Sequence, residues 1–576
     1  MIEVIYLLQC KMRKSDGRNA QKLVLLCLGT LSLAFLAIAP CNGQEAEIES
    51  VIPAYSVAYV AVKDVPGIWD TVKESSSWQS VLSFNELLDR TQDLMGRTEE
   101  FLGVDLRTLV GIFGSRMALV QVYMDMDGPT PPAIVADVGD SEDAAEIIQK
   151  IERALDSDEE YEVRSPAGTY QTIPFASIRR VGEEPAIRYA FLNNLFVIAF
   201  EQDTFEAILD VYLGDDPSLI YDPRYNRTRA GISVDGEVFV YINMELMWPI
   251  AWSSWLSEPG MLLRMLGADD IKSIAWTTGL VAPTKNQQAY FYTGDSRELI
   301  TSLFAEHDSL LSPHIIPASS ADIFLAMNLG DPVTAWERFG DAVRNVIGEE
   351  EHSQMQDAVT KFERETALSL EDDILSSLTG EIGLAMPAPG IMKLRAGSEY
   401  LMEEGLVMFC GVRDREQCAT SIERILLTEG LHIQQTEYGG GTIYHNPAQS
   451  GSDVPLGYAF AGDLLVYGSV QALQSIIDGD MPLVVSEKFA DISSQLSKRL
   501  GLMYYTDLEQ IGGLLMGANP DAQSGDDMMR LQTLGSTGGT LLYDGEGLKA
   551  ESVGTSAKSW LETTGILAEL FVYTLF

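Results

Sequence analysis

The sequence predicts an α+β protein built from two tandem homologous halves, each a mainly antiparallel or mixed sheet packed with helices. An Ile-Pro-Ala triplet opens a strand-like run at residues 52–54, and the same triplet opens another at residues 316–318. A Tyr-Ala-Phe triplet recurs in the same way at residues 189–191 and 458–460. Patterns typical of adjacent hairpins alternate with helical patterns, which favours an α+β fold over a parallel, doubly wound sheet.

The length of the chain requires more than one domain. It has 576 residues, whereas a single hydrophobic core stops growing at roughly 250–300 residues. The repeat places a first α+β unit at residues 50–306 and a second at residues 314–576, after an N-terminal segment of residues 1–43. Each half is therefore an internal control for the other, because a residue with unique chemistry should differ from its counterpart.

The first half is expected to alternate strands and helices. Residues 55–62 alternate in polarity as a strand does, and Pro66 then starts a helix that carries Trp69. The further elements expected are an amphipathic helix at 78–102, a short helix ending at Gly114, a strand from Met117, a helix at 144–155 capped by residues 140–142, a tight hairpin of 188–192 and 195–199, a helix at 204–213 and a strand at 238–242.

The second half repeats this order. Residues 321–327 form the strand, and Pro332 starts a helical pattern that carries Trp336 and continues through Phe362. The further elements expected are a short helix ending at Gly380, a helix at 418–427 capped from Asp414, a tight hairpin of 457–461 and 464–467, a helix at 470–477 and a strand at 502–505. A hairpin and a terminal helix are expected to close each half.

The N-terminus has the pattern of a secretory signal. A basic stretch precedes an uncharged, mostly apolar run at residues 23–40, as in the charged and hydrophobic regions of a signal peptide. Cleavage is expected near Cys41 or Gly43. An uncut run would just suffice as a membrane anchor, so membrane association through residues 23–40 is the alternative. Both outcomes place residues 45–576 outside the cytoplasm, in the periplasm or secreted.

The chain is strongly acidic. Asp and Glu number 84 against 39 Lys and Arg, for a net charge of −45. This charge repels a phosphate backbone, and proteins that bind nucleic acid normally show a basic footprint. We therefore exclude nucleic acid as a partner and interpret the acidity as a source of solubility.

The sequence lacks the motifs of known catalytic and cofactor sites. It has no Gly-x-Ser-x-Gly elbow, no His-Glu-x-x-His pair, no Walker loop and no Cys-x-x-Cys. All five histidines lie between residues 307 and 445, which excludes a histidine mechanism common to both halves. His445 is interpreted as an ordinary surface histidine. We predict no catalytic residue, no metal ligand and no cofactor.

Three local features resemble sites but have simpler interpretations. Residues 438–442, Tyr-Gly-Gly-Gly-Thr, resemble a phosphate cradle but lie between two strands, which favours a hairpin turn. Residues 125–128 begin like a calcium loop without its later acidic ligands, which favours a turn between strands. Cys410 and Cys418 correspond to alanines in the first half, which favours packed thiols over a disulfide.

One cluster differs between the halves. Trp248, Trp252 and Trp255 fall at helical spacing on one face, and the corresponding stretch after Tyr505 has no tryptophan. The simpler interpretation is a face packed into the junction between the halves. The sharper hypothesis is contact with an apolar ligand, a partner protein or a membrane surface.

The repeated motifs resemble a family of exported bacterial proteins known as a domain of unknown function (DUF3352-like). The resemblance rests on the Ile-Pro-Ala opening, the Gly-Glu-Ile-Gly-Leu-Ala unit at 380–385, and the hairpin at 458–460 that leads into the helix from Val470. It covers most of residues 50–576 and implies export but no activity.

Two classes of function are consistent with these observations. The preferred one is a non-catalytic exported protein, either a binding module or a structural component of the cell envelope. The alternative is an extracytoplasmic hydrolase that uses carboxylate acid and base residues. A continuous apolar groove between the halves would favour binding, whereas a cleft with two close acids of raised pKa would favour the hydrolase.

Overall fold

The structure is a computed structural model and shows an α+β protein, as predicted. It describes residues 48–74, 104, 106–125, 128–139, 141–182, 186–234, 236–254, 267–279, 287–294, 310–393, 405–446, 455–498, 501–517 and 535–555. Within these residues, twenty strands form one sheet and two short strands form another. The expected export segment, residues 1–43, and the expected helix at 78–102 lie outside the described residues.

The first half, up to Tyr292, alternates strands with helices. Its strands are β1 (Ala58–Lys63), β2 (Arg116–Gln121), β3 (Met124–Asp125), β4 (Gly128–Pro129), β5 (Ala133–Asp137), β6 (Tyr161–Tyr170), β7 (Ile173–Arg180), β8 (Ile187–Leu192), β9 (Leu195–Ala199), β10 (Val238–Asn243), β11 (Ser273–Thr278) and β12 (Gln287–Tyr292). Its helices are η1 (Ile48–Ser50), α3 (Val65–Glu74), α6 (Leu106–Gly111), α7 (Ser141–Asp156), α8 (Gln202–Leu213), η3 (Leu219–Tyr221), α9 (Pro223–Ala230), α10 (Met244–Ser254) and η4 (Ala268–Asp270).

The second half, from Ser312, follows a similar order. Its strands are β13 (Ile323–Asn328), β14 (Leu378–Met386), β15 (Val407–Val412), β16 (Gln434–Tyr438), β17 (Gly441–His445), β18 (Leu456–Ala461), β19 (Leu464–Ser469), β20 (Leu502–Asp507), β21 (Ser536–Tyr543) and β22 (Gly547–Gly554). Its helices are η5 (Ser312–His314), η6 (Ala318–Ser320), α13 (Pro332–Val346), α14 (Glu349–Thr366), η7 (Leu370–Ile374), η8 (Leu375–Ser377), α15 (Ala388–Lys393), α17 (Arg415–Thr428), α18 (Val470–Asp478), η9 (Leu483–Val485), α19 (Glu487–Ser493) and α20 (Leu508–Gly517).

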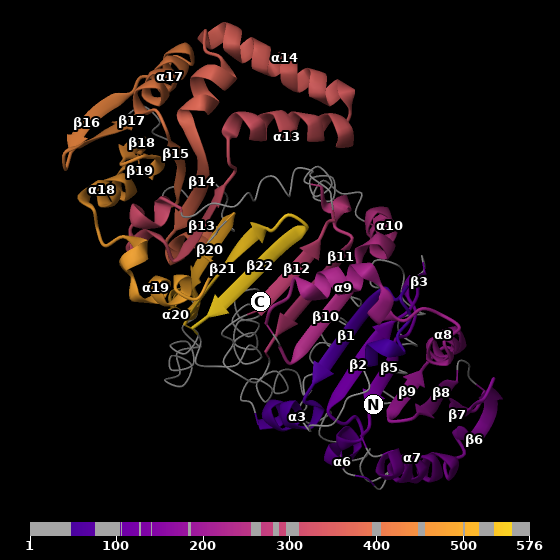
Figure 1. Ribbon diagram of the computed structural model, residues 1–576. Coiled ribbons are helices and arrows are strands. Elements are labelled where there is room, and N and C mark those ends of the chain that lie inside the picture. The colour runs from indigo at the N-terminus through magenta and orange to yellow at the C-terminus, as the bar shows by residue number, and fades with distance from the viewer. Residues whose placement is uncertain are drawn as a thin grey trace.

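The strands of the large sheet are antiparallel and have the same order in both halves. In the first half the order is β12-β11-β10-β1-β2-β5-β9-β8-β7-β6. In the second half it is β22-β21-β20-β13-β14-β15-β19-β18-β17-β16. Strands β12 and β22 pair with each other, so the two sheets join edge to edge. Figure 1 shows these two strands side by side near the middle of the molecule.

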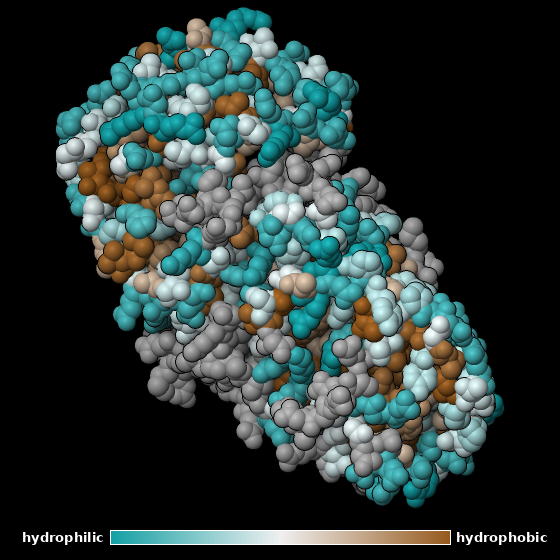
Figure 2. All heavy atoms as spheres, in the orientation of Figure 1, coloured by the Kyte–Doolittle hydropathy of each residue, from teal (hydrophilic) through white to brown (hydrophobic). Residues whose placement is uncertain are grey.

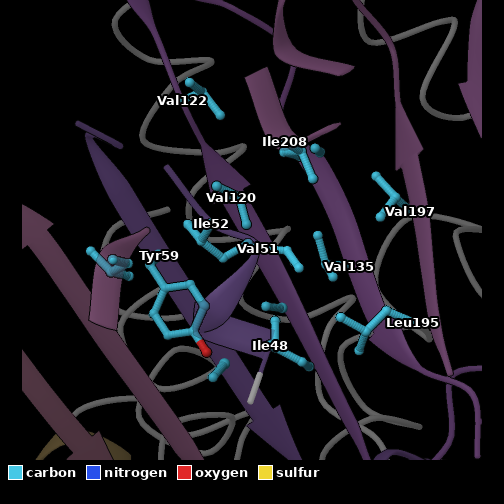
Figure 3. Close-up of a cluster of buried hydrophobic side chains, with 14 of the residues drawn as sticks. Ile48, Val51, Ile52, Tyr59, Val120, Val122, Val135, Leu195, Val197 and Ile208 are labelled. Atoms are coloured by element: carbon cyan, nitrogen blue, oxygen red, sulfur yellow. The ribbon is translucent and has the colours of Figure 1, made fainter. Parts of the chain in front are cut away.

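Hydrophobic residues fill both faces of the first half's sheet. Alternation along β1 sends Tyr59 and Ala61 to one face and Val60 and Val62 to the other. The core on the Tyr59 face includes Ile48 of η1 and Ile208 of α8. Figure 3 shows this cluster, with side chains from several strands gathered near Tyr59 and Ile48. Burial on two faces explains why these strands are rich in valine and isoleucine.

A separate core fills the same face of the second half. It includes Phe324 of β13, Phe409 of β15, Leu473 of α18 and Phe489 of α19. The outer surface is different in character. Figure 2 shows a mainly hydrophilic face with separate hydrophobic patches over both halves. Among the described helices, none is long and apolar enough to cross a membrane.

Two expected elements of the second half were wrong in detail. The helical pattern from Pro332 through Phe362 is broken into α13 and α14, because Gly348 between them has a φ of 140°, a conformation outside the helical region. The short helix does not end at Gly380. It ends at Ser377, and Gly380 lies inside β14, where the pairing with β15 changes register between Leu378 and Ile382.

Candidate functional site

The junction between the halves is an antiparallel pair of strands. Ala289 of β12 lies opposite Ala550 of β22, and Phe291 lies opposite Leu548. β12 and β22 are the last described strands of the two halves, and each is the pairing partner of the other half's edge strand. This pairing satisfies the backbone groups of two edge strands that would otherwise be open to aggregation.

Side chains also connect the halves. The Tyr290 hydroxyl donates to Asp544 Oδ1 at 3.0 Å, and burial raises the pKa of that phenol well above its usual range. Arg227 pairs with Glu546 at 2.9 Å, but both side chains are more than half exposed. Such an exposed ion pair contributes little free energy. Most of the free energy that holds the two halves together therefore comes from the strand pairing and from the side chains packed on it.

An apolar groove of about 480 Å³ runs over one face of this junction. One row of paired residues crosses five strands of it. The members of that row, from β11 to β20, are Trp276, Ala289, Ala550, Leu541 and Leu502. The hollow has a simple cause, because the two central positions carry only methyl side chains while Trp276 and the leucines stand on either side.

Polarity changes along the groove. The row at one end contains Phe291 and Leu548, which are apolar. The row at the other end contains Gln287 opposite Ser552, and the Ser552 hydroxyl lies 2.7 Å from the Tyr504 hydroxyl. The groove thus has an apolar middle, one apolar end and one polar end.

The acid in the described lining of the groove is already paired. Glu551 lies 3.0 Å from Lys549 Nζ and accepts a 3.3 Å hydrogen bond from Gln288. Its second oxygen accepts the backbone N–H of Ser497 at 3.2 Å. A carboxylate held by these three donors is a structural group rather than a general acid or base.

The tryptophan cluster predicted from the sequence lies partly within the described residues. Trp248 is half-buried on α10, and its indole N–H donates to the carbonyl oxygen of Ile271 at 2.8 Å. Ile271 lines the groove, whereas Trp248 is not among its lining residues. Trp252 falls on α10, but its side chain is not described, and Trp255 lies outside the described residues. Contact of all three with a ligand or partner stays a prediction.

The residues that form the middle of the groove were not predicted. Trp276, Ala289 and Ala550 carry no motif, and their proximity depends on the pairing of β12 with β22. The available signal was the internal comparison, since the position of Trp276 in β11 is taken by Gly539 in β21. That signal identifies a difference between the halves but does not identify a groove.

The other sequence interpretations have mixed outcomes. Residues 438–442 form the turn of the β16–β17 hairpin, as predicted. Residues 125 and 128 pair across β3 and β4, as expected for a turn between strands. Cys410 and Cys418 are free thiols, and burial raises the pKa of Cys410 to about 12. His445 is half-buried rather than on the surface, with Nε2 at 3.1 Å from the Thr436 hydroxyl.

Two acid pairs have one carboxyl of raised pKa. Burial, followed by the charge of Glu237, raises the pKa of Asp64. Burial also raises the pKa of Asp322, to which the charge of Asp507 adds. None of these acids lines the groove, so the observation that would favour a hydrolase is not met there. The described residues contain no cluster of three or more metal-ligating side chains.

Comparisons with known proteins do not identify a family. No protein-family description matches the chain, and no curated protein matches it. Among solved structures, "Structure of crystal form I of TP0453" aligns with 46% of this chain and 98% of its own, at 11% identity and a TM-score of 0.19. A similarity of that size supports no conclusion about fold or function.

Proposed function

We propose that this protein is an exported, non-catalytic binding protein of the cell envelope, in which the groove between the halves holds an amphiphile of the lipid class. The groove itself is the observation that carries the proposal. Its volume, about 480 Å³, lies in the range of small-molecule sites, which are mostly apolar with a few polar groups. The secretory pattern at residues 1–43 supports an extracytoplasmic location, either soluble or anchored through residues 23–40.

The polarity of the groove supports an amphiphile over a wholly apolar ligand. An alkyl chain would lie over Ala289 and Ala550 and extend toward Phe291 and Leu548. The polar group would then lie near Gln287 and Ser552, where hydroxyl and amide groups offer hydrogen bonds. The rival hydrolase lacks such support in this groove, because Glu551 is already paired.

We further propose that the two halves arose by duplication, as in the exported family that the motifs resemble. Supporting observations are the shared strand order and two matched β-bridges, Pro53 with Ser218 and Pro317 with Pro482. A matched ion pair adds to them: Arg224 with Glu245 at 2.6 Å in the first half corresponds to Lys488 with Glu509 at 2.8 Å in the second. On this proposal the groove exists only where the two copies meet.

A fluorescent fatty acid tests the ligand. Residues 45–576 are titrated with cis-parinaric acid, whose emission rises on transfer from water to an apolar site. Replacing Ala289→Leu and Ala550→Leu together fills the middle of the groove, and affinity should fall about tenfold or more, which is about 1.4 kcal/mol or more of binding free energy. Ala358→Leu, on the exposed face of α14, is the matched control and should leave affinity unchanged.

Two results would contradict this proposal. One is binding of the same affinity in the filled variant and in the control. The other is binding that is absent in the full chain and present in a chain ending at Thr555, because residues 556–576 would then be the occupant of the groove. Circular dichroism and the melting temperature show whether the filled variant folds.

A further inference from the structure

A second cavity lies at the far end of the first half's sheet, away from the junction. It has a volume of about 220 Å³ and lies where β6, β7 and β8 meet α8, a region labelled together at one end of Figure 1. Its lining includes Glu162, Arg164, Phe175, Arg179, Arg188 and Gln202. Three arginines in one small cavity are unusual in a chain of net charge −45.

Two of these arginines are held by one carboxylate. Glu162 Oε1 accepts from Arg164 Nε at 2.8 Å, and Glu162 Oε2 accepts from Arg179 Nε at 2.6 Å. The hydrogen bond from Arg179, and then that from Arg164, lowers the pKa of Glu162. Glu162 therefore stays ionised and holds two guanidinium groups next to each other in the lining of the cavity.

Arg188 has neutral partners. Its Nη2 donates to Gln202 Oε1 at 3.1 Å, and its Nη1 lies 3.4 Å from the carbonyl oxygen of Ala186. Among the described residues, no carboxylate lies within ion-pair distance of Arg188. Gln202 in turn donates to Glu206 at 2.7 Å, so an amide stands between this cation and the carboxylate of Glu206.

The cavity also has an aromatic wall. The Phe175 ring lies 5.6 Å from the Phe205 ring, with an interplanar angle of 61°. Phe205 is buried on α8, whereas Phe175 is half-buried and lines the opening. Tyr170 lies at the same border, with its hydroxyl on Asp210 at 2.7 Å. A ligand here would meet guanidinium groups on one side and a ring on the other.

The second half lacks this arrangement. In the first half one row of paired residues reads Arg164, Ser177 and Arg188 across β6, β7 and β8. The matching row across β16, β17 and β18 reads Gln434, His445 and Gly457. Both arginines are therefore absent at the equivalent positions, so the fold does not need them and they are candidates for a role specific to the first half.

We propose that this cavity binds a small carboxylate that carries an apolar group. Among the described lining residues, three arginines and the two acids Glu162 and Glu206 leave one net positive charge, which a single carboxylate neutralises. Arginine presents a planar pair of donors that matches a carboxylate, and Phe175 provides the apolar contact. The volume restricts the ligand to a small molecule or to the terminal residue of a peptide. This site is separate from the groove and does not depend on the function proposed for it.

Calorimetric titration with 3-phenylpropionate tests the proposal. The acid should bind in the micromolar to millimolar range, and 3-phenylpropionamide, which has the same shape without the charge, should bind at least tenfold more weakly. Arg188→Gln should weaken binding of the acid at least tenfold. Arg180→Gln is the matched control, because Arg180 lies on the same strand as Arg179, pairs with Glu160 at 2.7 Å and does not line the cavity.

The outcomes divide clearly. Equal binding of acid and amide, or binding unaffected by Arg188→Gln, overturns the site. The site is also overturned if the acid shows no binding at concentrations well above the millimolar range. Tighter binding of inorganic phosphate than of 3-phenylpropionate overturns the carboxylate class. A peptide ending in phenylalanine, compared with its amidated form, separates the two sources of the carboxylate. Selective binding of the peptide with the free carboxylate supports the proposal with a peptide end as the ligand. If this peptide does not bind but 3-phenylpropionate does, the proposal is supported with a small molecule as the ligand.

Discussion

The two halves place three aromatic rings alike but surround them differently. The three rings are Tyr59, Tyr225 and Tyr241 in the first half and Phe324, Phe489 and Tyr505 in the second. The first two rings of each set lie 6.3 Å apart, at 84° in the first half and 85° in the second. Edge-to-face packing of this kind stabilises a core beyond the area it buries, and both halves have it.

The polar groups around the rings differ. In the first half Glu49 of η1 accepts from Arg116 and, at 3.1 Å, from the Tyr225 hydroxyl. Arg116 also lies 3.3 Å from the Tyr59 hydroxyl. The first half therefore anchors its N-terminal turn to the sheet through a buried ion pair and two phenols.

The second half also anchors its first turn to the sheet, but the sheet residue of this anchor is an acid instead of a base. Glu381 of β14 lies opposite Asn328, in the register position that Arg116 takes opposite Lys63. Its two oxygens accept the backbone N–H groups of Leu311 and Ser312, each at 2.8 Å. Because the two phenols are phenylalanines here, no hydroxyl needs a partner. The two halves therefore share the ring packing and the path of the chain, whereas the polar groups around the rings are specific to each half.

The largest effect is expected from breaking the buried ion pair. Arg116→Met leaves the Glu49 carboxylate buried without its cation, which should lower the free energy of unfolding by about 3–5 kcal/mol. Urea denaturation followed by circular dichroism measures this loss. Lys150→Met is the control, because its pair with Glu146 on α7 is exposed and should be worth less than about 1 kcal/mol. Equal losses in both variants would show that the buried pair does not hold η1 to the sheet.

A reciprocal exchange of one hydroxyl should have a smaller effect. Tyr225→Phe removes a hydrogen bond to Glu49 and should cost about 1–2 kcal/mol. Phe489→Tyr adds a hydroxyl in the second half, where Pro313 stands in place of Glu49 and offers no side-chain acceptor. Burying that unpaired group should cost about 1–3 kcal/mol. Thermal denaturation of both variants measures the two losses, and a neutral Phe489→Tyr would show that the second half has a hidden partner for the hydroxyl.

The sequence predicted local structure well because local structure depends on neighbours in the chain. The hairpin at residues 187–199, the helix start at Pro332 and the cap at Asp414 follow from turn, proline and capping chemistry. The break at Gly348 was missed because the hydrophobic pattern of α13 and α14 continues across it. Pattern alone does not reveal where a glycine leaves the helical region.

The groove was not predictable for a different reason. Ala289 and Ala550 become neighbours only because β12 pairs with β22, and no periodicity within either strand encodes that partner. The arginine cavity has the same character, since Arg164 and Arg188 meet through the register of β6, β7 and β8. Sites built from side chains of several strands require the register, which follows from the whole fold.

The smallest effect is expected at Asp322, a half-buried acid just before β13, whose matching position before β1 is taken by Val57. Asp322 accepts the backbone N–H of Ala388 at 2.7 Å, and burial, followed by the charge of Asp507, raises its pKa, while Lys488 acts in the opposite direction. Since the folded-state pKa exceeds the unfolded one, stability falls as pH rises through the interval between them, and Asp322→Asn should be more stable than the parent by up to about 1 kcal/mol at pH 7. The gain should vanish below about pH 4, where the carboxyl is protonated in both states. Asp331 has the opposite effect on the pH dependence of stability. The hydrogen bond from the Thr334 N–H lowers the pKa of Asp331, so its contribution to the free energy of unfolding is lost as pH falls. Denaturation midpoints of Asp322→Asn from pH 3 to pH 8 measure this difference, and a variant that is less stable at every pH would mean that the bonds of the carboxylate outweigh its burial.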